Sequence, residues 1–233
     1  GGEGRARSPP ALEVFAYLFA SVRVHSARLP KLLLLEATTL RLLADRLAAD
    51  YETGLQRCSD ALAVLDVAEQ ILLARRPTGA RNSELRNVLN TRATVHGFVV
   101  GNLLRAYGGV TGTKRDEMRS QIFAAFSDVD HLAARSRGLG DSSFYPLDVT
   151  FWVYRDVFEQ LPDLTEEERL RLLERMEAVL DAVDESPIES NQMERFQRRA
   201  VNLAQLEGNA ALSETLATSM RLQGDFSGEC LLV

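Results

Sequence analysis

Asparagine and arginine side chains recur at spacings of three and four residues in the second half of the chain. Asn102 and Arg105 lie three residues apart, as do Arg195 and Arg198, and Asn202 follows Arg198 by four. Residues at these spacings share one face of an α-helix. An asparagine amide can hold an extended main chain through its donor and acceptor, and an arginine fork can bind carboxylates or phosphates. The pattern predicts recognition of a protein, a peptide or an anionic ligand.

An aromatic side chain extends this candidate site. Trp152 and Arg155 are three residues apart and would share a face of the helix that contains both. The predicted binding residues are therefore Asn102, Arg105, Trp152, Arg155, Arg195, Arg198 and Asn202. The alternative is that these are solvated helix positions, with the arginines paired to Glu194, Glu189 or Asp156 as surface ion pairs that contribute little.

Catalytic motifs do not emerge from the sequence. The loop Gly108–Lys114 is rich in glycine but lacks the spacing of a phosphate-binding loop. His25, His96 and His131 are too far apart for two of them to share a helix face as metal ligands. We therefore expect no enzymatic activity, no cofactor and no metal. The alternative is an all-helical enzyme whose site is assembled from scattered residues.

Composition limits the classes of partner. The 233 residues carry a formal net charge of −6, which argues against a general nucleic-acid surface. No apolar run is long enough to span a bilayer. Two distant cysteines, Cys58 and Cys230, fit a reducing cytoplasm better than a disulfide framework. The scarcity of lysine beside arginine hints at a GC-rich bacterial genome. We expect a cytoplasmic chain with no membrane partner, and oligomerisation stays open.

The distribution of residue types predicts helices throughout. Alanine, leucine, glutamate and arginine dominate, and they favour helices because they lose little side-chain freedom there. We expect a flexible linker over 1–10, a helical domain over 11–223, and a tail or truncated next element over 224–233. Glycine, proline and capping residues divide the domain into nine helices, at about 11–26, 30–50, 55–76, 82–107, 113–137, 146–161, 165–185, 186–207 and 209–222.

Several helix ends have specific expected caps. Asn82, Thr113 with Asp116, and Thr165 with Glu168 are predicted to begin three of the helices, and Ser186 another. Gly208 is expected to end a helix with a positive φ, and Asn209 to cap the next one. Gly101 lies inside a predicted helix, where it is expected to allow close packing.

Two segments 100 residues apart resemble each other. Gly101-Asn102-Leu103-Leu104 is followed by Gly108, six residues after the asparagine, and Val201-Asn202-Leu203-Ala204 is followed by Gly208 at the same distance. Arg155 falls at the matching place of the helix between them. Together with the turn Leu206-Glu207-Gly208-Asn209, these segments resemble degenerate tetratricopeptide repeats over 82–223.

The resemblance implies antiparallel hairpins stacked as a right-handed solenoid, with the first helix of each hairpin on the concave face. It also implies a non-enzymatic binding or scaffold module within a larger assembly. The segment Phe144–Asp148 is similar to divergent bacterial repeats attached to signalling or anti-phage NTPases, which implies a sensor or regulatory role. A compact helical bundle is the alternative fold, because its helices would obey the same periodicity.

Overall fold

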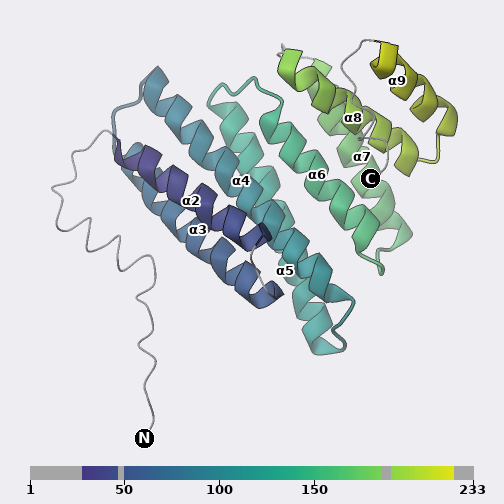
Figure 1. The fold of residues 1–233 in the computed structure, drawn as a ribbon, viewed down its shortest axis with the longest axis horizontal. Helices are drawn as coiled ribbons and strands as arrows, with labels where there is room; N and C mark the ends of the chain where they lie inside the picture. Colours follow the sequence, from purple (N-terminus) through teal and green to yellow (C-terminus); the bar gives the residue numbers. More distant parts are fainter. Residues whose placement is uncertain (1–27, 47–49, 185–189, 223–233) are drawn as a thin grey trace, which may run out of the picture.

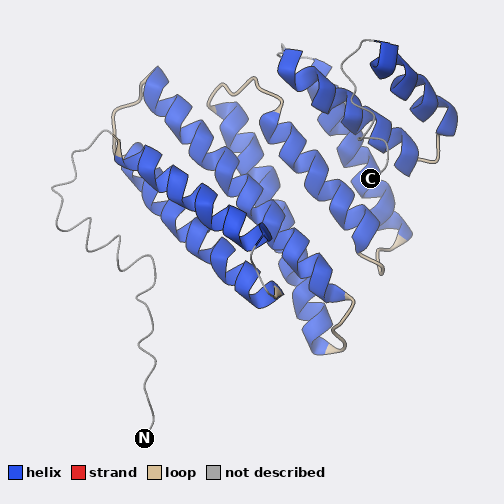
Figure 2. Cartoon of the chain, in the orientation of Figure 1, coloured by secondary structure: helices blue, strands red, loops and turns tan. Residues whose placement is uncertain are grey.

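The structure is a computed structural model that describes residues 28–46, 50–184 and 190–222, and all regular structure in these ranges is α-helical (Figure 1; Figure 2). The helices are α2 (Leu29–Arg46), α3 (Tyr51–Leu73), α4 (Gly79–Tyr107), α5 (Thr113–Gly138), α6 (Tyr145–Gln160), α7 (Glu166–Asp184), α8 (Ser190–Leu206) and α9 (Ala210–Leu222). The predicted all-helical class is confirmed. The expected linker 1–10, the expected helix 11–26 and the tail 224–233 lie outside the described residues.

Local capping explains where several helices begin. The main-chain N–H of Thr165 donates to the Glu168 carboxylate at 2.8 Å, and the Glu168 N–H donates to the Thr165 hydroxyl at 3.2 Å, so the predicted capping box at α7 is confirmed. The Asn209 side chain accepts from the Leu212 N–H at 3.1 Å, which confirms the cap of α9. Gly208 has a φ of +73°, as a helix-ending glycine should.

Two predicted caps are wrong. Helix α4 begins one turn earlier than expected, because the Thr78 hydroxyl accepts from the Arg81 N–H at 3.1 Å and Asn82 lies inside the helix. Helix α5 has no side-chain cap; its first turn follows Gly112, whose φ of +59° reverses the chain direction. The cap predicted at Ser186 lies outside the described residues.

The helices pack as four hairpins in chain order, α2–α3, α4–α5, α6–α7 and α8–α9 (Figure 1). The first helices of neighbouring hairpins also make backbone contact, α2 with α4, α4 with α6, and α6 with α8. Over the described ranges, no such contact joins the second helices α3, α5, α7 and α9. The first helices therefore form a continuous row, which we call the first-helix row.

The core follows from this order of contacts. Helix α4 touches α2, α3, α5 and α6, and it buries residues on all its sides, including Leu85, Val88 and Leu104. One apolar cluster runs from Leu33 in α2 to Leu203 in α8. A small separate cluster of Val201 and Ala217 joins α8 to α9. In the parts of the chain that the structure describes, no helix is both long enough and apolar enough to cross a membrane.

The glycines at close helix contacts differ from Gly101, the one that the sequence predicted for this role. A Cβ placed on Gly101 would meet no heavy atom within 4 Å, so the expected packing role of Gly101 is wrong. The tight contacts occur at two other helix glycines. A Cβ on Gly97 would lie 2.8 Å from the Trp152 ring, and one on Gly54 would lie 2.4 Å from the Asn102 side-chain oxygen. These glycines let α4 approach α6 and α3.

We expect Gly97→Ala to destabilise the fold by about 1–3 kcal/mol, because its Cβ would overlap the Trp152 ring and force a shift at the α4–α6 contact. Gly101→Ala is the matched control on the same helix. It should stabilise by up to about 1 kcal/mol, since alanine loses less backbone entropy than glycine. Urea unfolding of both variants gives the comparison, and equal effects at the two positions would contradict the assignment.

Candidate binding face

Asn102 packs between helices and does not stand on an open face. Only 2% of the residue is exposed, and it lies against Gly54 of α3. Its amide donates to the main-chain oxygen of Phe98 at 2.8 Å, while its oxygen accepts from the exposed Arg105 at 2.9 Å. Both hydrogen-bonding groups are thus engaged inside the protein. Asn102 belongs to the α3–α4 contact, and the exposed Arg105 caps its side-chain oxygen from the same helix.

Trp152 joins α4 to α6. Its ring meets Phe98 edge-on, with 5.4 Å between ring centroids and 66° between planes, and the Arg41 guanidinium of α2 lies 5.4 Å from the centre of the Phe98 ring. Arg155, one turn further along α6, points back to its own helix. It contacts Asp156 at 2.8 Å and Glu159 at 3.5 Å. Trp152 therefore serves packing within the first-helix row. Arg155 forms the ion pair with Asp156 that the sequence analysis gave as the alternative to ligand binding.

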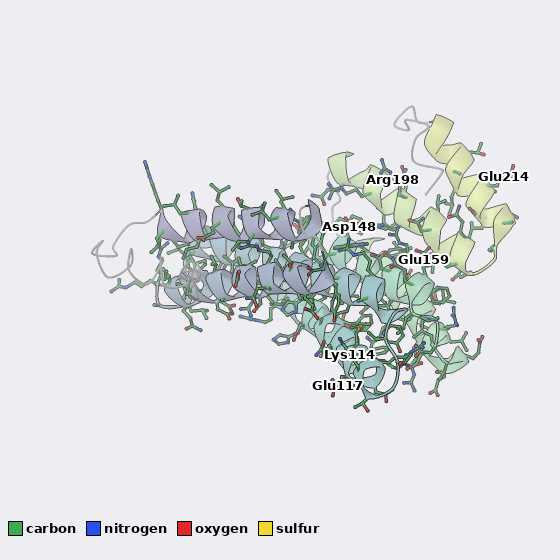
Figure 3. The ribbon with its side chains drawn as sticks, turned by 60° about the horizontal axis from the view of Figure 1, so that its bottom comes forward. Lys114, Glu117, Asp148, Glu159, Arg198 and Glu214 are labelled. Atoms are coloured by element: carbon green, nitrogen blue, oxygen red, sulfur yellow. The ribbon has the colours of Figure 1, made fainter. Side chains whose placement is uncertain are left out.

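Two arginines of α8, Arg195 and Arg199, face α6. Arg199 donates to Asp148 at 2.7 Å, and Arg195 lies 3.7 Å from the other oxygen of the same carboxylate. Asp148 is only 8% exposed, so these contacts tie α8 to α6. Figure 3 labels Asp148 on α6 and Arg198 on α8; Arg198 and Asn202 are half-buried. The carboxylate at the contact of Arg195 and Arg199 is Asp148, which the sequence did not suggest; the side chains of Glu189 and Glu194 lie outside the described part of the chain.

A polar cavity that sequence reasoning missed lies on the first-helix row. Its volume is about 540 Å³, within the usual range of small-ligand sites. It is lined by α2, by the first half of α4, by the loop before α6, and by the first residue of α6. The lining residues are Leu34, Thr38, Ser83, Arg86, Asn87, Asn90, Thr91, Asp141, Ser142, Ser143 and Tyr145. We call it the α2–α4–α6 cavity.

Asp141 organises one wall of this cavity. Its carboxylate accepts from the Asn90 amide at 2.8 Å, the Ser136 hydroxyl at 2.8 Å, and the Ser143 main-chain N–H and hydroxyl at 3.0 and 2.6 Å. Burial by itself would raise the pKa of Asp141, but these hydrogen bonds outweigh it and lower the pKa below the ordinary 3.8. Asp141 is therefore a carboxylate held rigidly in the charged state.

The other polar groups of the cavity are also fixed. The Arg86 guanidinium donates to the main-chain oxygen of Gly140 at 2.6 Å. The Thr94 hydroxyl donates to the Asn90 main-chain oxygen at 2.9 Å and lies 2.9 Å from the Tyr145 hydroxyl. Because the Thr94 proton is already used, Tyr145 is the donor of that second bond. A ligand would meet polar groups whose positions are set before it binds.

The sequence contained only part of the signal for this site. The sequence has an aspartate, Asp141, two residues before Ser143. An aspartate at this spacing often accepts a hydrogen bond from the main-chain N–H two residues later in a turn. Asp141 and its partner Asn90 are 51 residues apart in the sequence. Tyr145 of α6 and its partner Thr94 of α4 are separated by the same distance. Periodicity within one helix cannot indicate which residues two distant segments bring together.

A second polar cluster joins α3, α4 and α5, and none of its residues lines the cavity. Glu69 has a side chain that is only 6% exposed, and it contacts Arg92 of α4 and Arg135 of α5. Arg92 also lies 2.8 Å from Asp66. His96 follows Arg92 by one turn and has its Nδ1 3.4 Å from Asp128; burial lowers the pKa of His96 despite that carboxylate. The cluster bridges helices that have no backbone contact, α3 and α5.

Metal binding has no support in the described ranges, where no group of histidine, cysteine, aspartate and glutamate side chains is arranged to hold an ion. The α2–α4–α6 cavity presents hydrogen-bonding groups held in fixed positions, an arrangement that can bind a polar ligand. Comparison with known proteins gives no matching family model, no matching curated protein and no matching solved structure.

Proposed function

We propose that the chain is a non-enzymatic binding module of the helical-repeat kind, and that it holds an extended peptide or protein segment along the first-helix row. The observation that carries the proposal is the α2–α4–α6 cavity, which is lined by three successive first helices and the loop between α5 and α6. A ligand placed there would contact several hairpins at once, as a partner of a repeat protein does.

The packing order supports a curved array. The first helices touch one another, while the described second helices α3, α5, α7 and α9 do not. If this difference in spacing continues along the molecule, the row bends toward the first helices and makes them the concave side. We infer a tetratricopeptide-like solenoid on this ground. Packed helices lie about 8–10 Å apart, so four of them span about 27 Å, the length of about eight extended residues.

The polar character of the row favours an extended segment as the ligand rather than an apolar helix. An apolar helix would need a hydrophobic groove, whereas Leu34 is the one aliphatic side chain that lines the cavity. An extended chain carries unpaired main-chain N–H and C=O groups, which polar walls can satisfy. The hydroxyl and amide groups of α2 and α4 fit this requirement.

The test is selection of a random twelve-residue peptide library displayed on phage, followed by photo-cross-linking of the selected peptides. We expect cross-links to α2, α4 and α6. Asn87→Arg places a long cation at the exposed edge of the cavity and should weaken binding at least tenfold. Gln70→Arg, at an exposed position of α3, is the matched control and should leave binding unchanged. Failure to select any peptide, or cross-links confined to α3, α5 and α7, would refute the proposal.

A further inference from the structure

We infer that the α2–α4–α6 cavity is a subsite for a primary carboxamide, the side chain of an asparagine or glutamine in the bound segment. The inference rests on the proposed peptide-binding function and assigns a ligand chemistry to one place on the first-helix row. It follows from two observations: several donor groups of the cavity are already engaged in hydrogen bonds within the protein, and the lining carries one charge of each sign.

The threonine hydroxyls of the cavity donate their hydrogen bonds to main-chain oxygens of their own helices. Thr38 donates to the Leu34 main-chain oxygen at 2.8 Å, and Thr91 donates to that of Asn87 at 2.9 Å. The hydroxyl of Ser143 likewise donates to Asp141 at 2.6 Å, and that of Tyr145 to Thr94. A hydroxyl with a committed proton still carries lone pairs, so these four groups offer acceptors to a ligand.

Asn90 adds a further acceptor. The residue is 8% exposed, and its amide nitrogen donates to Asp141. Its side-chain oxygen is buried and accepts no hydrogen bond from the described residues. A buried acceptor without a donor is unfavourable, and a ligand N–H would remove that cost once the Asn90 side chain turns toward the cavity. The four hydroxyl oxygens are the acceptors that the cavity presents directly. The cavity therefore favours a group with more than one donor.

The charges in the cavity favour a neutral ligand over an ionic one. Arg86 is the one cation and Asp141 the one anion among the lining residues, so their charges balance. An ammonium group attracted by Asp141 would be repelled by Arg86, and a carboxylate attracted by Arg86 would be repelled by Asp141 and would face the acceptor oxygens of Thr38 and Thr91. A primary carboxamide has two N–H donors for those oxygens and one carbonyl oxygen that can accept from the guanidinium of Arg86.

Thr38 and Thr39 provide a matched pair for the test. Both are on α2, and both donate to the main-chain oxygen four residues earlier, Thr39 to Leu35 at 3.0 Å. Thr38 lines the cavity and Thr39 does not. Valine has the shape of threonine without the oxygen. Thr38→Val and Thr39→Val therefore lose the same kind of helix contact, at a half-buried and an exposed position respectively, and only Thr38→Val removes an acceptor from the cavity.

The experiment uses the same random twelve-residue library. Selected peptides should share an asparagine or glutamine at one position, and replacement of that residue by methionine or glutamate should weaken binding at least tenfold. Thr38→Val and Thr91→Val should each weaken binding by about two- to tenfold, the range for one hydrogen bond, and Thr39→Val should not. Because the peptide substitutions do not touch the protein, this result is independent of folding.

Two results separate this inference from the proposed function. If peptides bind the first-helix row but show no preference for a carboxamide, or bind Thr38→Val and Thr91→Val as they bind the wild type, the subsite is overturned while peptide binding stands. If the library yields no peptide for the wild-type protein, the proposed function falls and the subsite falls with it.

Discussion

Replacing Glu69 by glutamine is expected to destabilise the protein by about 3 kcal/mol, because it leaves two arginines facing a buried site without their carboxylate. Arg92 and Arg135 approach Glu69 from two different helices, and the Glu69 side chain is almost fully buried. This figure is at the lower end of the range for a broken buried pair. Arg92 keeps Asp66 at 2.8 Å, and the Arg135 side chain is 35% exposed, so water can solvate it.

Thermal or urea unfolding measures this loss. For a chain of this length, 3 kcal/mol corresponds to a fall of about 6–12 °C in Tm. Glu167→Gln is the control, since Glu167 pairs with Arg171 on the exposed face of α7 and should change stability by less than about 0.5 kcal/mol. Removing Arg135 together with Glu69 should recover part of the loss. Equal effects of Glu69→Gln and Glu167→Gln would show that the cluster does not support the fold.

The helical class and several helix ends could be predicted because they depend on local chemistry. The capping box at Thr165 needs only a hydroxyl and a carboxylate three residues apart. The start of α4 was missed because Thr78 and Asn82 are both competent caps one turn apart, and the sequence does not rank them. The hairpin order follows from short connections, whereas the proposed curvature depends on spacings between helices that no single helix encodes.

The position of Asn102 shows why the candidate site was harder to predict than the fold. Its spacing to Arg105 is correct for a shared helix face, and the two side chains do meet. Helix α4, however, is buried on several sides by α2, α3, α5 and α6, so it has no single apolar stripe from which an open face could be inferred. The same reasoning applies to the glycines: Gly97 and Gly101 share the helix, and only the position of Trp152 on α6 distinguishes them.

Replacing Asp141 by alanine is expected to destabilise the protein at neutral pH by about 2–4 kcal/mol, because several donors lose their acceptor at once. Ser136 has no exposed surface and Asn90 has little, so water cannot replace the carboxylate at either. Ser143 loses the acceptor of both its main-chain N–H and its hydroxyl, which hold the chain at the start of α6. Asp141→Asn keeps one acceptor oxygen, and its stability should lie between those of the wild type and Asp141→Ala.

Acid provides a second measurement on the same residue. The pKa of Asp141 is lower in the folded protein than the ordinary 3.8, so the unfolded chain takes up its proton first as the pH falls. The stability that Asp141 contributes is therefore fully present above about pH 5, and it is lost as the pH falls through the folded-state pKa. The deficit of Asp141→Ala relative to wild type should accordingly be large at pH 7 and shrink below pH 3.8. Taking the difference cancels the acid effects of other carboxylates such as Asp163 and Glu168, whose pKa values are also lowered. A deficit that stays constant from pH 7 to pH 3 would mean that Asp141 acts through its shape alone, and the charge that balances Arg86 in the cavity would then have no energetic role in the fold.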